Sequence, residues 1–102
     1  MKYRILLSET AKLSLKSLDS RVREIIGRKI EELKESPEKR GKALQGDLSR
    51  FRSIPAAGRF RIVYEVRKLQ IIVHVIAIGI RREGDRLDVY AALKRYLRMG
   101  LL

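Results

Sequence analysis

RFRIVYEVRKLQIIVHVIAIG, residues 59–79, is the stretch that decides the fold. Polar and apolar residues alternate along 59–66, which predicts a strand with one buried face. Residues 69–79 are mostly apolar and rich in β-branched side chains, which predicts a second strand. Arg67 and Lys68 lie between the two segments and predict a two-residue turn. The stretch therefore predicts an antiparallel hairpin.

The alternation assigns the side chains of the first predicted strand to two faces. One face carries Phe60, Ile62, Tyr64 and Val66, and the other carries Arg59, Arg61, Val63 and Glu65. We expect the apolar set to face helices and the second set to lie on a partly open face. A two-residue turn would place Val66 opposite Leu69, Tyr64 opposite Ile71, Ile62 opposite Val73, and Arg61 opposite His74.

Two helices are predicted before the hairpin. Residues 2–7 predict a short strand, and Ser8 is the expected N-cap of a helix whose apolar positions are Ala11, Leu15 and Leu18. Asp19 and Ser20 predict the start of a second helix, with a stripe of Val22, Ile25, Ile26, Ile30 and Leu33. Ser36-Pro37 ends it, because the residue before proline leaves helical geometry.

The remaining segments complete the predicted order. Residues 38–49 are polar and predict a loop, 50–55 predict a strand, and 55–58 predict a turn. Residues 87–99 predict a last helix with Val89, Leu93, Tyr96 and Leu97 on its apolar side, ended by Gly100. We expect one α+β domain over residues 1–102, of order β-α-α-β-β-β-α. An antiparallel sheet with the two early helices on one face would bury the apolar sets.

Composition excludes several kinds of site. The 102 residues include no cysteine and one histidine, so disulfides, Cys/His zinc sites, an HExxH helix and a cysteine nucleophile are all ruled out. No acidic cluster has metal-ligand spacing, so we expect no metal and no cofactor. No apolar run has the length of a signal peptide or a membrane span, so we expect a soluble cytoplasmic protein.

The formal charge of +12 indicates an anionic partner, with nucleic acid as the first candidate and an anionic membrane surface as the second. Residues 39–68 carry nine basic and two acidic side chains, and 81–98 carry six and three. The plain alternative is a surface made basic for solubility, but such surfaces usually mix the two signs.

Arginines on the open face predict a phosphate-binding surface. Arg50 and Arg52 would join Arg61 there if Phe51 points to the core. The planar arginine fork pairs two phosphate oxygens and keeps its charge. Rigid strands position such groups better than loops do.

RNA cleavage without a metal needs help for the 2′-hydroxyl proton, for the charge on the phosphorane and for the leaving 5′-oxygen. Arginines supply the second need. Tyr90, beside Asp88 and Lys94 on the last helix, and His74 are candidates for proton transfer. Each has an alternative role in packing.

Three segments resemble the RelE/ParE toxin superfamily: LQGDLSRFRSIPAAGRFRIVYEV (44–66), IIVHVIAIGIRR (71–82) and DVYAALKRYL (88–97). The most specific pieces are Leu44-x-Gly46, the run Arg61 to Tyr64, and Gly79-x-Arg81 with Tyr90 nine residues later. The resemblance covers nearly the whole chain and implies the topology derived above.

The resemblance implies a toxin that enters the ribosomal A site and cleaves mRNA without a metal, as RelE-type members do. It implies that Arg61 and Arg81 bind the transferring phosphate, that Tyr90 orients the RNA, and that Arg52 stands where relatives have a lysine. Besides this catalytic set, we expect Arg50, Arg59 and Arg82 to bind RNA and His74 to be an accessory group. A cognate acidic antitoxin, forming a hetero-oligomer with the toxin, is the further implied partner, and no membrane is.

One departure keeps other functions open. Ile54 stands where RelE-type enzymes have a second lysine, which often acts as the general base, and arginine is a poor base because its pKa is too high. The alternatives are a ParE-like inhibitor of DNA gyrase without nuclease activity, and an RNA-binding relative whose catalytic site has decayed.

Overall fold

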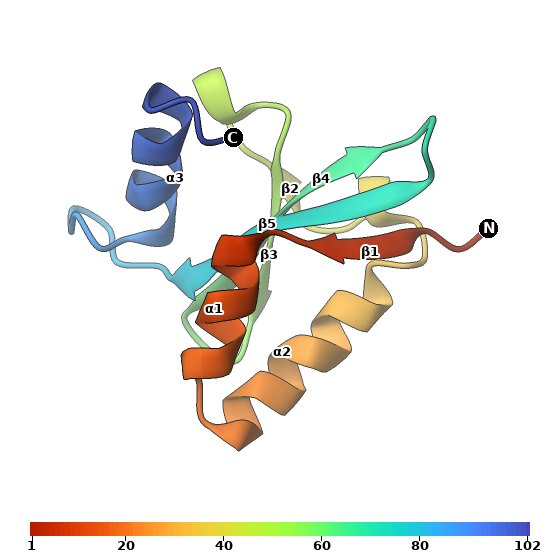
Figure 1. The fold of residues 1–102 in the computed structure, drawn as a ribbon, viewed down its shortest axis with the longest axis horizontal. Helices are drawn as coiled ribbons and strands as arrows, with labels where there is room; N and C mark the ends of the chain where they lie inside the picture. Colours follow the sequence, from red (N-terminus) through yellow and green to blue (C-terminus); the bar gives the residue numbers. More distant parts are fainter.

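The predicted hairpin forms two inner strands of a five-stranded sheet in the computed structural model, which describes residues 1–102 (Figure 1). The strand order across the sheet is β1-β5-β4-β3-β2. The elements in chain order are β1 (Arg4–Leu7), α1 (Glu9–Ser17), α2 (Ser20–Glu32), β2 (Lys42–Ala43), β3 (Arg52–Ala56), β4 (Phe60–Arg67), β5 (Ile72–Ile80) and α3 (Val89–Arg98). Short 3₁₀ turns lie at Pro37–Lys39 and Gly46–Leu48. None of the helices combines the length and the apolar character needed to cross a membrane.

The α+β class and the order of the main elements are confirmed, but the sheet is mixed rather than antiparallel. β1 pairs with β5 in parallel, with Arg4 beside Ile72. The chain leaves β1 through α1 and α2 and re-enters the sheet at the opposite edge, in β2. That edge strand, β2, has only two residues and pairs with β3. A strand of two residues is too short to show an alternation of polar and apolar residues in the sequence.

Side-chain caps fix the helix starts where the sequence predicts them. The Ala11 N–H donates to Ser8 Oγ at 3.0 Å. The N–H groups of Arg21 and Val22 both donate to Asp19 Oδ1 at 3.0 Å. These bonds satisfy N–H groups that have no partner inside the helix.

Two hydrophobic cores lie on opposite faces of the sheet, with α1 and α2 on one side and α3 on the other (Figure 1). The first core contains Ala11, Ile26, Ile30, Leu33, Ile54, Ala56, Ile62, Tyr64, Val73, Val75 and Ile78. The second contains Leu48, Phe51, Val63, Ile76, Ala77, Val89 and Leu93. α3 therefore covers part of the face that the sequence left open.

The register of the β4–β5 hairpin differs from the predicted one. Arg67 pairs with Ile72, and residues 68–71 form the turn, so Glu65 lies opposite His74 and Val66 opposite Val73. Leu69 and Ile71 resemble strand residues in sequence, which is why the turn was predicted too short. A bulge beside Val63 and Tyr64 shifts the pairing again, and Arg61 lies opposite Gly79 rather than His74.

The face predicted for Arg52 is also wrong. Arg52 pairs directly with Tyr64, and Ile54 pairs with Ile62. Because directly opposed residues point to the same face of a sheet, both lie on the side of α1 and α2. Phe51 precedes the strand and packs in the second core instead.

Candidate functional site

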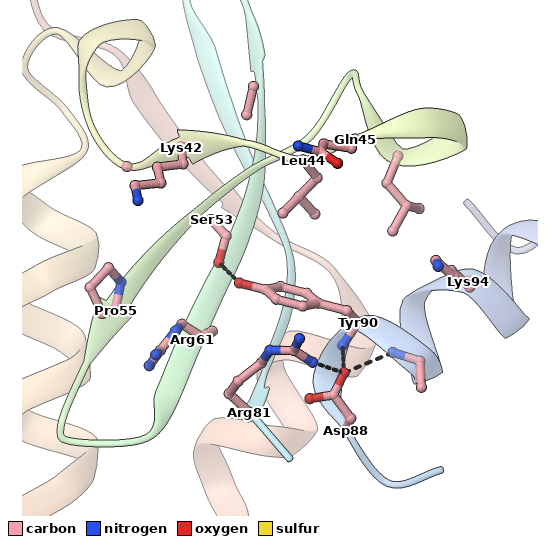
Figure 2. Close-up of a pocket in the computed structure, with 14 residues that line it drawn as sticks. Lys42, Leu44, Gln45, Ser53, Pro55, Arg61, Arg81, Asp88, Tyr90 and Lys94 are labelled. Carbon is pink, nitrogen blue, oxygen red and sulfur yellow. Dashed lines mark hydrogen bonds and ion pairs between the residues drawn. The ribbon is translucent and has the colours of Figure 1, made fainter. Parts of the chain in front are cut away.

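A cleft of about 800 Å³ opens between the start of α3 and the sheet strands β2, β3 and β4 (Figure 2). Its lining residues are Gly41, Lys42, Ala43, Leu44, Gln45, Leu48, Ser53, Pro55, Arg61, Arg81, Asp88, Tyr90, Ala91 and Lys94. The cleft therefore brings together the three residues that were predicted from the sequence to share one site, Arg61, Arg81 and Tyr90.

Alternation along β4 and a close approach at β5 bring these residues together. Arg61 lies opposite Gly79 on the face that α3 covers. A Cβ atom on Gly79 would lie only 3.1 Å from Val89 Cγ2, so the missing side chain lets α3 begin close to β5. Tyr90 follows Val89 and therefore enters the cleft beside the end of that strand.

Arg81 lies against both Asp88 and Tyr90. Its Nη1 atom is 2.6 Å from Asp88 Oδ2, and its guanidinium carbon lies 4.7 Å from the centre of the Tyr90 ring. The hydrogen bond to Asp88 raises the pKa of the Arg81 guanidinium further above its usual value. A cation stacked on an aromatic face is a favourable contact. The arrangement presents a permanent positive charge beside an aromatic ring.

Burial raises the pKa of the Asp88 carboxyl, but hydrogen bonds from Arg81 and from the N–H groups of Arg82 and Ala91 outweigh it and lower the pKa below its usual value. Asp88 is therefore an anion throughout the neutral range.

The Tyr90 hydroxyl reaches across the cleft to β3. It lies 2.6 Å from the buried Ser53 Oγ, and either oxygen can donate the hydrogen (Figure 2). This bond and the Arg81 contact hold the ring at two points.

Charge in the cleft is strongly positive. Lys42, Arg61, Arg81 and Lys94 line it, against the single carboxylate of Asp88. Arg61 bonds the carbonyl oxygens of Gly58 and Phe60, and neither it nor the two lysines forms an ion pair. A phosphate group is the anion that matches several such donors around one cavity.

Arg52 does not reach the cleft. Its side chain leaves the sheet on the face of Tyr64, where its Nε donates to the Arg40 carbonyl at 2.8 Å and its Nη2 to the carbonyl of Gly41, at the edge of the cleft, at 3.1 Å. Ile54 lies beside it in the first core. A lysine at position 54 would point into that core, so its absence takes nothing from the cleft.

Arg50 and His74 belong to a second, smaller cavity of about 220 Å³ at the far end of α3. Arg50 pairs with Glu65 at 3.4 Å, and His74 Nδ1 lies 3.1 Å from Arg67 Nη2. Burial, with the charge of Arg67, lowers the pKa of His74. His74 lies opposite Glu65, and Glu65 is four residues from Arg61 along β4, which is ~13 Å at the usual rise of a strand. Val63 and Ile76 lie between His74 and Arg61.

Arg59 and Arg82 flank the cleft without lining it. The Arg81 N–H donates to the Arg59 carbonyl at 2.8 Å, and the Arg82 N–H donates to Asp88 Oδ1 at 2.6 Å. Both side chains are exposed.

Five polar residues of the cleft were not assigned a role from the sequence, namely Lys42, Gln45, Ser53, Asp88 and Lys94. Lys94 lies one helical turn after Tyr90, a spacing that places both on one side of a helix. Asp88 precedes the apolar run of α3, which is the signature of an N-cap. Ser53 and Lys42 gave no signal, because their positions depend on the β3 register and on β2. No group of three or more metal-binding side chains occurs.

Comparison with known proteins gives consistent matches. The family model described as the ParE toxin of the type II toxin–antitoxin system parDE matches residues 5–84. The mRNA interferase toxin RelE of Escherichia coli K12 is 33% identical over 98 residues, which cover 95% of this chain and all of RelE. A structure of an E. coli RelE mutant in the free state superposes with a TM-score of 0.73 at 31% identity, over 93% of this chain and 98% of the other. The toxin in the intact E. coli RelBE toxin–antitoxin complex gives 0.65 at 27% identity, over 79% and 99%.

Proposed function

This chain belongs to the RelE/ParE superfamily of toxins from type II toxin–antitoxin systems, and on that premise we propose that it is a metal-independent endoribonuclease that cleaves mRNA on the ribosome. The observation that carries the proposal is the contact of Arg81 with Tyr90 in the same cationic cleft as Arg61. The relatives named mRNA interferase support the choice of reaction.

The proposed reaction is an attack by the ribose 2′-oxygen on the adjacent phosphorus. The 2′-hydroxyl loses its proton, a phosphorane with an added negative charge forms, and the 5′-oxygen leaves with a proton. Arg61 and Arg81 stabilise the charge that develops on the phosphorane oxygens. Because both are held by the protein before substrate arrives, little reorganisation is needed.

Tyr90 orients the RNA in this proposal. Its ring is backed by Arg81 and its hydroxyl is held by Ser53, so a base or ribose can pack against a fixed surface. Tyr90, Lys42 and Lys94 are the cleft's side chains that can carry a proton to or from the reacting oxygens. His74 takes no part, since it lies in the other cavity.

An acidic antitoxin is the proposed partner, and mRNA on the ribosome is the proposed substrate, which places the action in the cytoplasm. Relatives of this fold are known in complexes with RelB-type antitoxins. The formal charge of +12 supports such a partner, because opposite charges speed association and favour a complementary surface. We propose that the antitoxin covers the cationic face or displaces α3.

Translation in vitro with a primer-extension readout tests the proposed reaction. We expect new 5′ ends within the translated part of the message when the toxin is added, and none when ribosomes are omitted. A supercoiling assay with purified gyrase, run in parallel, tests the alternative target. Inhibition of gyrase with intact mRNA would overturn the proposal.

Gyrase inhibition is the second candidate, and one observation favours it. The ParE family model matches residues 5–84, which excludes Asp88, Tyr90 and Lys94. The matched part contains Arg61 and Arg81, but the cleft residues at the start of α3 lie outside it.

A further inference from the structure

One carboxylate joins the end of β5 to the start of α3. Asp88 is 3% exposed and is the only buried charged residue in the chain. Its Oδ1 accepts the Arg82 N–H at 2.6 Å, and its Oδ2 accepts the N–H groups of Tyr90 at 3.1 Å and Ala91 at 3.2 Å. The same Oδ2 lies 2.6 Å from Arg81 Nη1.

Capping alone does not require this arrangement. Asp19 caps α2 through two backbone N–H groups, yet it is exposed and forms no ion pair. Asp88 makes the same kind of cap and in addition holds an arginine in the cleft. The bonds to Arg81 and to the Arg82 N–H distinguish Asp88 from Asp19.

Arg81 is fixed from two directions. Asp88 binds one of its nitrogens, and the Tyr90 ring lies under its guanidinium carbon at 4.7 Å (Figure 2). Arg81 Nη2 also lies 3.7 Å from the exposed Glu83 Oε1, beyond hydrogen-bond distance. An arginine has five N–H donors, so donors of Arg81 stay available to an anion in the cleft. A long flexible side chain is thereby held in place before a phosphate binds.

We propose that Asp88 is a positioning residue that holds Arg81 in the orientation that the phosphate site needs. Its capping carboxylate sets the orientation of Arg81, and Arg81 in turn supports Tyr90. The chemical consequence rests on the proposed ribonuclease function, whereas the positioning of Arg81 does not.

The test compares Asp88→Asn with the matched cap variant Asp19→Asn. Asparagine is as good an N-cap as aspartate, so both variants keep a capping oxygen. Only Asp88→Asn takes away a negative charge that faces an arginine, together with one of the two carboxylate oxygens that accept from Arg82 and from the start of α3. Asp88→Ser, which also keeps a cap, serves if Asp88→Asn folds poorly. Circular dichroism and thermal unfolding establish that each variant is folded.

The first readout is the Arg81 side-chain N–H signal in ¹⁵N-edited NMR spectra, assigned with Arg81→Lys. We expect a resolved, slowly exchanging signal in the parent protein and in Asp19→Asn, and its loss in Asp88→Asn. An unchanged Arg81 signal in Asp88→Asn overturns the proposal. This readout decides the matter even if the protein cleaves no RNA.

The second readout is single-turnover cleavage of mRNA on programmed ribosomes. We expect Asp88→Asn to lower the maximal rate by about 10²-fold, the scale of a misplaced catalytic group, with little change in the toxin concentration that gives half the maximal rate. In an Arg81→Ala background the same substitution should have no further effect. An equal loss in both backgrounds would mean that Asp88 does not act through Arg81, and would overturn the proposal. Absence of cleavage by the parent protein contradicts the proposed function instead.

Discussion

Tyr90 and His74 are both proton-carrying side chains on the α3 side of the sheet, but they lie at opposite ends of α3. Tyr90 lines the cationic cleft with Arg61 and Arg81, whereas His74 lines the second cavity with Glu65 and Arg67. The predicted register placed His74 beside Arg61, and the four-residue turn together with the bulge separates them. Only Tyr90 remains close to the proposed phosphate site.

Substitution of these two residues should therefore have unequal effects. We expect Tyr90→Phe to slow mRNA cleavage, because it removes the hydroxyl that bonds Ser53 and can carry a proton. We expect His74→Ala to leave the cleavage rate close to that of the parent protein. Rates on programmed ribosomes across pH measure both. A large loss in His74→Ala with none in Tyr90→Phe would place the reaction in the second cavity and contradict the assignment to the cationic cleft.

His74 should instead affect stability at acid pH. Burial and Arg67 lower its pKa in the folded state below the usual 6.5, so the unfolded chain binds a proton first as the pH falls. The stabilisation is complete above the unfolded pKa and is lost as the pH falls through the folded pKa.

Urea unfolding at a series of pH values between neutral and mildly acid measures this effect. The parent protein should lose unfolding free energy over that interval, and His74→Gln, which cannot take up a proton, should lose less. Equal slopes for the two proteins would mean that His74 does not contribute to the pH dependence.

At the scale of elements, the approach of α3 to β5 determines whether the cleft forms. Gly79 allows it, because a Cβ there would lie 3.1 Å from Val89 Cγ2 and 3.2 Å from Val89 Cβ. We expect Gly79→Ala to cost ~1–3 kcal/mol of unfolding free energy, as overpacking of a core does, and to reduce cleavage by moving Tyr90.

A double-mutant cycle with Val89→Ala checks the cause, because it removes Val89 Cγ2, the nearer of the two close contacts. The cost of Gly79→Ala in urea unfolding should be smaller in that background. Gly27→Ala is the matched control, since a Cβ at Gly27 in α2 meets nothing within 4 Å. A cost at Gly79 that does not change with Val89 would contradict the packing account.

Elements with a strong local signal could be predicted from the sequence. Ser8 and Asp19 cap the helices at the expected positions, and Gly100, at φ +72°, ends α3 as expected. The partner and direction of β1 could not be predicted, because they are set by contacts distant in the sequence. β2 owes its existence to pairing with β3 and carries no pattern of its own.

The site was predictable to the extent that it depends on alternation within one strand or on family resemblance. Arg61 follows from the first, and Arg81 and Tyr90 follow from the second. The prediction for Arg52 is wrong because it took Phe51 to point into a core beneath α1 and α2, whereas Phe51 packs in the second core on the α3 side, and alternation then puts Arg52 on the side of α1 and α2. Ser53 and Pro55, rather than residues 52 and 54, line the cleft for the same reason.

At the scale of the whole molecule, the positive charge should govern encounter with an acidic antitoxin. Residues 39–68 carry nine basic and two acidic side chains, and the cleft draws on this region through Lys42 and Arg61. We expect the association rate to fall as ionic strength rises. At low ionic strength, we expect Lys94→Gln, in the cleft, to lower the rate more than Arg21→Gln, on α2, does. Stopped-flow mixing measures these rates. A rate independent of salt would count against electrostatic attraction.

The proposed function requires that the cleft formed by Arg61, Arg81 and Tyr90 cleaves mRNA. The most direct measurement is single-turnover cleavage of mRNA on programmed ribosomes by Arg61→Ala and Arg81→Ala, with the exposed α2 variant Arg21→Ala as control and circular dichroism to verify folding. The account predicts a loss of ~10²–10³-fold in each cleft variant, the usual cost of removing a transition-state donor, and parental activity in the control. Full activity in both cleft variants would contradict it.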